Sequence, residues 1–404
     1  MDYIRFFLGN KRLISFGFIL TFFSSFGQTF LLSLYVPRII EEFQLTNSYF
    51  GGLYAIATVG SSFILAYVGK LIDKTDLRKY TMYSAVLLML ACLILAFSFN
   101  IVMIFFGLLG LRFAGQGLLS HISNTSISKF FDKTRGKALS ITSLGYSTGE
   151  GIFPVLMSFV IIFAGWRNSL IINSAVVAFE LLPFVWLALS KQKVQQNDNI
   201  GETSTPTFSR KELFADKNFY LIAANSIVLP FLVTGLFFYQ ASLAQFKGWT
   251  LEWLSFSFIG FAVGRTIFSL ISGKFIDKYS AIKLLPFYLI PFFVGLLTLL
   301  FVNHIYAALV YLTLTGVAIG LSGTIKTAVI AEIYGTNNLG GIRSVFATIA
   351  ILGTALSPFL FGWLIDNGYN FSHIIILGLV IAAVVGLLST QVAEQRKPAL
   401  QTNS

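Results

Sequence analysis

Five charged residues lie away from the ends of the long apolar stretches of this sequence, namely Arg112, Glu150, Glu180, Arg265 and Lys326. A charge in apolar surroundings is costly unless it is paired or hydrated, so such residues are candidates for function. A carboxyl group there can take up and release a proton. A guanidinium group can bind a carboxylate through two parallel hydrogen bonds.

Arg112 and Glu150 each lie near the middle of an apolar stretch, which predicts that they meet at one depth. Polar residues lie on the same helix face at helical spacing, among them Gln116 beside Arg112, and Ser143 and Ser147 beside Glu150. One interpretation is a hydrated cavity in which Glu150 exchanges a proton. The alternative is a permanent ion pair between Arg112 and Glu150 that fixes two helices.

Arg265 is the main candidate for binding an anion. If Glu150 neutralises Arg112, no acid within the apolar stretches of the second half remains for Arg265. An unmatched guanidinium would attract a carboxylate, whereas the alternative is that Arg265 extends to the membrane surface. Lys326 lies nearer the end of its stretch, so extension to the surface is favoured there and anion binding is the alternative.

The stretches that position these residues are membrane spans. The sequence is 56% hydrophobic and 11% charged over 404 residues, with a mean hydropathy of +0.79, unlike a soluble protein. We predict an all-α integral membrane protein with two six-helix halves at 1–190 and 219–390, a linker at 191–218 and a tail at 391–404. The twelve predicted spans, each bounded to within about three residues, are 13–36, 48–68, 80–99, 101–122, 138–163, 168–190, 219–243, 251–272, 282–302, 304–328, 341–364 and 372–390.

Lysine and arginine residues predict the orientation of the chain. With a cytoplasmic N-terminus, 22 of the 28 lie in cytoplasmic segments and three in outer loops. The net charge of +11 therefore indicates membrane orientation rather than nucleic-acid binding. An even number of spans also places the C-terminus in the cytoplasm.

The two halves share a short motif. Gly69 to Lys74 reads GKLIDK, and Gly273 to Lys278, 204 positions later, reads GKFIDK. Gly149 and Pro154 match Gly353 and Pro358 at the same offset, which indicates an internal duplication. Both copies follow an apolar span and fall in predicted cytoplasmic loops.

This layout resembles the Major Facilitator Superfamily over essentially the whole chain. The family's loop after span 2 has the pattern G-x-L-x-D-[RK]-x-G-[RK]-[RK], although Asp76 replaces its second glycine here. Arg112 and the glycines after it resemble the family's span 4. Glu150 stands where family antiporters have a proline in span 5. The residues that fit the loop pattern are Gly69, Leu71, Asp73, Lys74, Arg78 and Lys79.

The resemblance implies alternating access between the two halves, with a substrate site near the midplane. It also implies that Asp73 faces Arg135 or the start of span 11. Spans 1 and 7 line the pathway in the family, which makes Gln28, Tyr239 and Gln240 candidates for binding, or else for helix–helix hydrogen bonds. The gating candidates are Gly69, Asp73, Lys74, Arg135, Gly273, Asp277 and Lys278.

Two further expectations come from the same family. Its oxalate/formate antiporters and monocarboxylate transporters have an arginine at a place similar to that of Arg265. In those proteins this arginine binds the substrate carboxylate. Span 6 is peripheral in the family, so Glu180 is expected to be protonated and bonded to a neighbouring helix. The single cysteine, Cys92, excludes an internal disulfide.

We therefore predict a monomeric, proton-coupled carrier of a small organic anion such as a monocarboxylate, in the cell inner membrane. The alternative is an efflux carrier of drug-like compounds or siderophores. The sequence has no nucleotide-binding loop or hydrolase motif, and its three histidines are scattered. We accordingly expect no enzymatic activity, no metal and no cofactor.

Overall fold

The computed structural model describes residues 2–131, 134–189, 210–335 and 339–392, and the elements in these ranges are all helical. The predicted linker before residue 210 and the tail from residue 393 lie outside the described residues. Eleven of the described helices are long and apolar enough to cross a membrane. The prediction of an all-α, twelve-span fold in two halves is confirmed.

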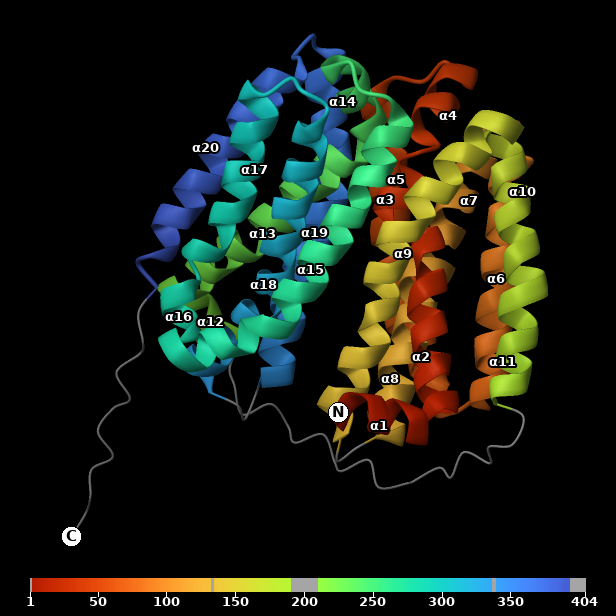
Figure 1. The fold of residues 1–404 in the computed structure, drawn as a ribbon, viewed down its shortest axis with the longest axis horizontal. Helices are drawn as coiled ribbons and strands as arrows, with labels where there is room; N and C mark the ends of the chain where they lie inside the picture. Colours follow the sequence, from red (N-terminus) through yellow and green to blue (C-terminus); the bar gives the residue numbers. More distant parts are fainter. Residues whose placement is uncertain (1, 132–133, 190–209, 336–338, 393–404) are drawn as a thin grey trace.

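The N-terminal half contains the first six spans (Figure 1). The first span is broken into four short helices, and the fourth and sixth spans each contain a π-helical segment. The elements are α1 (Asp2–Gly9), α2 (Lys11–Phe23), η1 (Ser24–Gly27), α3 (Thr29–Leu32), α4 (Val36–Glu42), α5 (Asn47–Val68), η2 (Gly69–Asp73), α6 (Leu77–Ala96), α7 (Ile101–Gly110), η3 (Leu111–Leu119), α8 (Ser120–Phe130), α9 (Arg135–Ala164), α10 (Trp166–Val176), η5 (Val177–Leu181) and α11 (Leu182–Ala188).

The C-terminal half contains the other six spans and follows the short helix α12 (Arg210–Ala215). Its elements are α13 (Lys217–Phe238), α14 (Gln240–Lys247), α15 (Leu251–Tyr279), α16 (Ala281–Leu284), η6 (Phe287–Leu289), α17 (Ile290–Phe301), α18 (Tyr306–Tyr334), α19 (Leu339–Asp366) and α20 (Phe371–Ser389). Helix α15 continues through the second copy of the repeated motif, whereas the first copy ends its span as the 3₁₀ segment η2.

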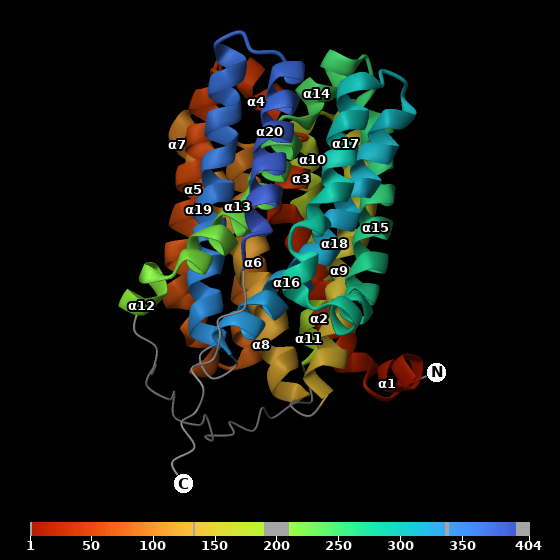
Figure 2. The ribbon, with the colours of Figure 1, turned by 90° about the vertical axis from the view of Figure 1, so that its left-hand side faces the viewer.

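The ends of the helices define two ends of the molecule. Helix α1 and the end of α11 lie at one end, here called the terminal end, and α20 runs toward it from the opposite end (Figures 1 and 2). At the opposite end, the far end, four helices begin with a side chain that accepts a hydrogen bond from the third residue beyond it. Such caps satisfy backbone N–H groups that lack a helical partner. The capping residues are Thr46, Asn100, Thr250 and Asn370.

The break in the first span is held by the fourth span. Gln28 is extended, with φ −84° and ψ 151°, so the helix stops at Gly27. Gly27 and Gly115 face each other so closely that a Cβ at Gly115 would lie 2.7 Å from the Gly27 nitrogen. Arg112 donates to the Gly27 carbonyl at 3.0 Å, which satisfies an acceptor at the break.

We expect Gly27→Ala to destabilise the protein, because the new methyl group would overlap the Leu111 carbonyl oxygen and Gln116 nitrogen. Backbone atoms cannot move aside as a side-chain tip can, and overpacking of this kind costs about 1–3 kcal/mol. Thermal unfolding in detergent should show a lower midpoint. Gly136→Ala is the control, because nothing lies within 4 Å of its added Cβ. Equal midpoints for the two variants would contradict the expected close packing.

Candidate functional site

The two halves are joined near the middle of the membrane by an ion pair. Glu150 on α9 accepts a hydrogen bond through Oε1 from Nη1 of Arg265 on α15. The Glu150 side chain is 10% exposed and the Arg265 side chain 30%. Glu150 Oε2 is buried and has no hydrogen-bond partner among the described residues. The pair therefore leaves one carboxylate oxygen unsatisfied.

This arrangement rules out one of the two interpretations of Glu150. The alternative of a permanent Arg112–Glu150 pair is wrong, and so is the inference drawn from it that no acid remains for Arg265. Arg112 is 4% exposed and donates to the Thr58 hydroxyl at 3.1 Å and to the Gly27 carbonyl. Its guanidinium also lies 5.0 Å from the centre of the Tyr54 ring. Arg112 thus has neutral partners within the N-terminal half.

The approach to the Glu150–Arg265 pair from the terminal end is polar. Ser143 lies seven residues before Glu150 on α9, and Ser269 lies four residues after Arg265 on α15, and both are exposed. Residues at these spacings share a helix face with the charged groups. Exposed hydroxyl groups therefore lie about one helical turn from Arg265 and two turns from Glu150, on the terminal-end side of the pair.

Lys326 does not extend to the membrane surface as the favoured interpretation held. It lies on α18 and donates to the Ser226 carbonyl of α13 at 3.3 Å. Its ammonium is 5.4 Å from the centre of the Tyr288 ring. Lys326 therefore points into the C-terminal half, where its one hydrogen bond to a described residue goes to a backbone carbonyl.

Tyr239 and Gln240 join the halves at the far end. The Tyr239 hydroxyl is 2.8 Å from the Asn47 carbonyl and 2.9 Å from the Pro358 carbonyl. Gln240 Nε2 donates to the Phe30 carbonyl at 2.9 Å and to the Ser33 hydroxyl at 2.6 Å. Both side chains are buried by these contacts, so in this conformation they close the far end.

Gln28, the third candidate of this kind, lies at the break in the first span. Its side chain is partly exposed and makes no hydrogen bond to the described residues. Its role in binding stays a prediction.

A residue that the sequence analysis missed strengthens the far-end contact. Asp366 ends α19, and its carboxylate accepts from the backbone N–H groups of Asn47 at 3.1 Å and of Ser48 at 2.7 Å. These are the first residues of α5, so a carboxylate from one half caps a helix of the other. A Cβ on Gly51 would lie 2.5 Å from the Pro358 carbonyl oxygen, which shows how closely α5 and α19 pack. A lone aspartate after an apolar span gave no sequence signal for this role.

Among the described residues, every hydrogen bond or ion pair between the halves lies either at the Glu150–Arg265 pair or between that pair and the far end. The two helical bundles converge toward the far end and diverge toward the terminal end (Figure 1). The far end is therefore the closed side of this conformation.

We expect Asp366→Asn to weaken far-end closure, because the amide loses the negative charge and one acceptor oxygen. Loss of a helix cap costs about 0.5–2 kcal/mol, which corresponds to a roughly two- to thirtyfold shift between closed and open states. Spin labels at Phe99 and Phe301, both highly exposed at the far end, report the distance between the halves. The longer distance should become more populated in the variant.

Glu41→Gln is the matched control for this experiment, because the partner of Glu41 is Arg38 on the same helix. An unchanged distance distribution in Asp366→Asn would remove Asp366 from the closing contact.

The first copy of the repeated motif makes contacts within its own half. Asp73 pairs with Lys129 at the end of α8 rather than with Arg135, and among the described residues it makes no hydrogen bond or ion pair with span 11. His121 Nε2 lies 3.0 Å from the Gly69 carbonyl oxygen. Lys74 and Arg135 are exposed. This copy therefore joins spans 2 and 4 of one half.

The second copy is more open. Nothing lies within 4 Å of a Cβ built on Gly273, Asp277 is exposed, and Lys278 lies 4.9 Å from the centre of the Tyr279 ring. The joining contact here comes from Glu332 on α18, which accepts from the Ala281 N–H at 2.8 Å. The gating role assigned to both copies stays a prediction.

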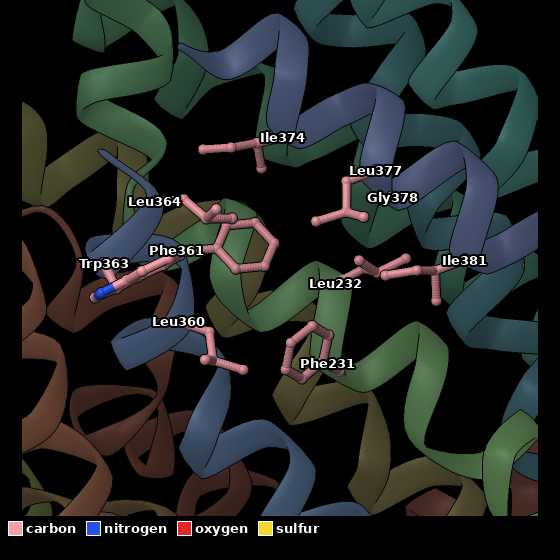
Figure 3. A pocket seen from close by; sticks show the side chains of 10 residues that line it. All are labelled: Phe231, Leu232, Leu360, Phe361, Trp363, Leu364, Ile374, Leu377, Gly378 and Ile381. Atoms are coloured by element: carbon pink, nitrogen blue, oxygen red, sulfur yellow. The ribbon is translucent and has the colours of Figure 1, made fainter. Parts of the chain in front are cut away.

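An apolar pocket of about 250 Å³ lies between α13, α19 and α20 (Figure 3). Phe231, Trp363 and Ile381 are among its lining residues, and none of the ten side chains that line it is charged. It offers no cationic side chain to a carboxylate. No group of three metal-ligating side chains occurs in the described ranges.

Comparison with known proteins places the chain in a family. The family model described as Major Facilitator Superfamily matches residues 17–264 and 248–403. A hexuronate transporter of Bacillus subtilis (strain 168) is 24% identical over 392 residues, covering 88% of this chain and 89% of the relative. An uncharacterised MFS-type transporter of the same organism, YwoD, is 21% identical and covers 88% and 90%.

Two solved structures share the fold. A bacterial homologue of the human lysosomal transporter Spinster, in an inward-facing and occupied conformation, has a TM-score of 0.70 at 14% identity and covers 99% of this chain and 100% of its own. The nucleoside transporter NupG has a TM-score of 0.72 at 13% identity, with 94% and 97% covered. With two six-helix halves that meet at one end, this chain belongs to the Major Facilitator Superfamily and is a multi-pass membrane transporter that works by alternating access, not an enzyme.

Proposed function

We propose that this protein carries a small monocarboxylate together with a proton across the cell inner membrane. The observation that carries the proposal is the Glu150–Arg265 pair between the halves, with Glu150 Oε2 unsatisfied. Arg265 is the group that suits a carboxylate, and in the empty protein it already binds one. A substrate anion must therefore displace Glu150 from the guanidinium.

Protonation of Glu150 is what makes the displacement favourable. A neutral carboxyl group no longer competes for Arg265, and the unsatisfied Oε2 is a natural position for the proton. The empty site holds one positive and one negative charge. The loaded site, with the proton on Glu150 and the anion on Arg265, is also neutral overall. Proton and monoanion are then carried together, because either one alone leaves a net charge near the midplane.

The similarity to a hexuronate transporter supports a hydroxylated monocarboxylate. A hexuronate has one carboxylate and several hydroxyl groups. In this proposal Arg265 binds the carboxylate, while Gln28, Ser143 and Ser269 offer hydrogen bonds to hydroxyl groups. Arg112 and Lys326 contribute positive potential from the two halves rather than direct ligation.

The orientation of the protein is part of the proposal. The lysine and arginine distribution favours cytoplasmic termini, so the terminal end is the cytoplasmic end. The far-end closure then corresponds to an inward-facing state. Tyr239, Gln240 and Asp366 keep the outer side closed while substrate exchanges with the cytoplasm.

The proposal is tested with purified protein in proteoliposomes under an imposed pH gradient. Glucuronate should accumulate on the side of higher pH, and the matching neutral sugar, glucose, should not. Dissipating the gradient with a protonophore should abolish accumulation. Transport of apolar or cationic compounds, without any carboxylate, would instead favour an efflux carrier of drug-like compounds.

A further inference from the structure

Glu180 lies where a carboxyl group has no partner in the described part of its own chain. It was expected to bond a neighbouring helix, but the structure places it on the outer surface of the N-terminal half. It makes no hydrogen bond or ion pair with the described residues. Its neighbour Phe179 is 81% exposed and Leu187 is 68% exposed, so the surrounding face is the one that lipid chains cover.

The local backbone explains why Glu180 points outward. Pro183 has no backbone N–H, so it cannot donate the helical hydrogen bond to the Phe179 carbonyl. The π-helical turn η5, Val177–Leu181, lies just before this proline and contains Glu180. Single π-helical turns inside α-helices occur often at functional positions.

The depth of Glu180 excludes water and lipid headgroups as partners. The span runs from Trp166 to Ala188, 23 residues, so Glu180 lies three residues from its middle. At about 1.5 Å per residue this is about 4.5 Å from the bilayer centre. The hydrocarbon core extends about 15 Å to each side of that centre, which is beyond the reach of a glutamate side chain.

The remaining partner is protein, and the carboxyl group fits its own copy. A neutral carboxyl both donates and accepts, so two of them can form a pair of hydrogen bonds. In a twofold dimer whose axis is normal to the membrane, residues near the axis meet their copies at the same depth. None of the three basic residues within the spans is available as an alternative, because Arg112 and Lys326 point into their own halves and Arg265 binds Glu150.

In place of the predicted monomer, we propose that the face formed by α10, η5 and α11 is a dimer interface with a second copy of this chain, centred on a hydrogen-bonded pair of neutral Glu180 side chains. Polar side chains commonly join helices in this way inside membranes. The interface is independent of the transport proposal, because each copy contains a complete Glu150–Arg265 site.

Cysteine cross-linking in proteoliposomes tests the interface. The native Cys92 is buried, so an introduced cysteine reports its own surroundings. Phe179→Cys should form a disulfide-linked dimer on oxidation. Phe163→Cys is the control, because Phe163 is 86% exposed and belongs to α9, which is not part of the proposed interface. We expect at least tenfold more dimer from the cysteine at 179, and equal yields would overturn the proposal.

Two further substitutions test Glu180 itself in the Phe179→Cys protein. Glu180→Gln should retain the dimer, because an amide also donates and accepts. In Glu180→Leu the apolar leucine side chain is compatible with lipid but cannot form the hydrogen bonds, so the dimer yield should fall at least tenfold. Dimers that persist with leucine, or are lost with glutamine, would overturn the role of Glu180. Cross-links to another polypeptide in native membranes, without the dimer, would indicate a different partner and refute the second copy.

Discussion

Replacing Glu150 with glutamine should abolish accumulation driven by a pH gradient while leaving exchange of substrate at equal pH intact. Glutamine resembles the protonated carboxyl group, so Arg265 stays available to the substrate. Exchange needs only the loaded carrier, which remains neutral at Arg265. Net transport also requires the empty carrier to reorient, and in the variant this carrier has an unmatched guanidinium near the midplane.

The pH dependence of binding gives a second readout for the same variant. In the wild type, raising the pH deprotonates Glu150, which then occupies Arg265, so substrate affinity should fall. In Glu150→Gln the affinity should be independent of pH over the same range. Glu41→Gln, an exposed carboxylate outside the site, should behave like the wild type.

A purely structural ion pair predicts a different result. Breaking a buried pair by removing one partner costs about 3–5 kcal/mol, so accumulation and exchange would fall together and the unfolding midpoint would drop. Retained exchange with a normal midpoint is therefore the outcome that distinguishes coupling from structure.

The fold was predictable because the length of an apolar stretch indicates a membrane span, and the position of a residue within the stretch indicates its depth. Apolar stretches and their boundaries gave twelve spans, and the repeated GKxIDK motif gave the two halves. The first span was predicted as one continuous helix. Its break at Gln28 depends on the approach of Gly27 to Gly115 and on the hydrogen bond from Arg112, and these are tertiary contacts.

The partners in the site were less predictable for a related reason. Position along a span gives depth, and Arg112, Glu150 and Arg265 all lie near one depth. Which of the two arginines faces Glu150 depends on helix rotation and on packing between the halves, neither of which appears in a single sequence. The same limit applies to Tyr239 and Gln240, whose contacts across the far end depend on the conformational state.

Arg265 is the residue on which the anion proposal depends, and its substitution should weaken substrate binding about ten- to a hundredfold. A hydrogen bond to a charged group contributes about 1.5–3 kcal/mol, and about 1.4 kcal/mol is a factor of ten. Arg265→Gln removes the charge and the paired donors. Arg265→Lys keeps the charge but cannot form two parallel hydrogen bonds to a carboxylate, so it should also be impaired.

The single substitution alone does not separate binding from stability, because Arg265→Gln leaves Glu150 buried without its partner. The double variant Glu150→Gln, Arg265→Gln resolves this, since neutral partners of similar size remove the uncompensated charge. We expect the double variant to recover the unfolding midpoint of the wild type but not its affinity for glucuronate, measured by calorimetry. If affinity returns with stability, or if the best ligand proves neutral or cationic, Arg265 serves the structure and the protein is not a carboxylate carrier.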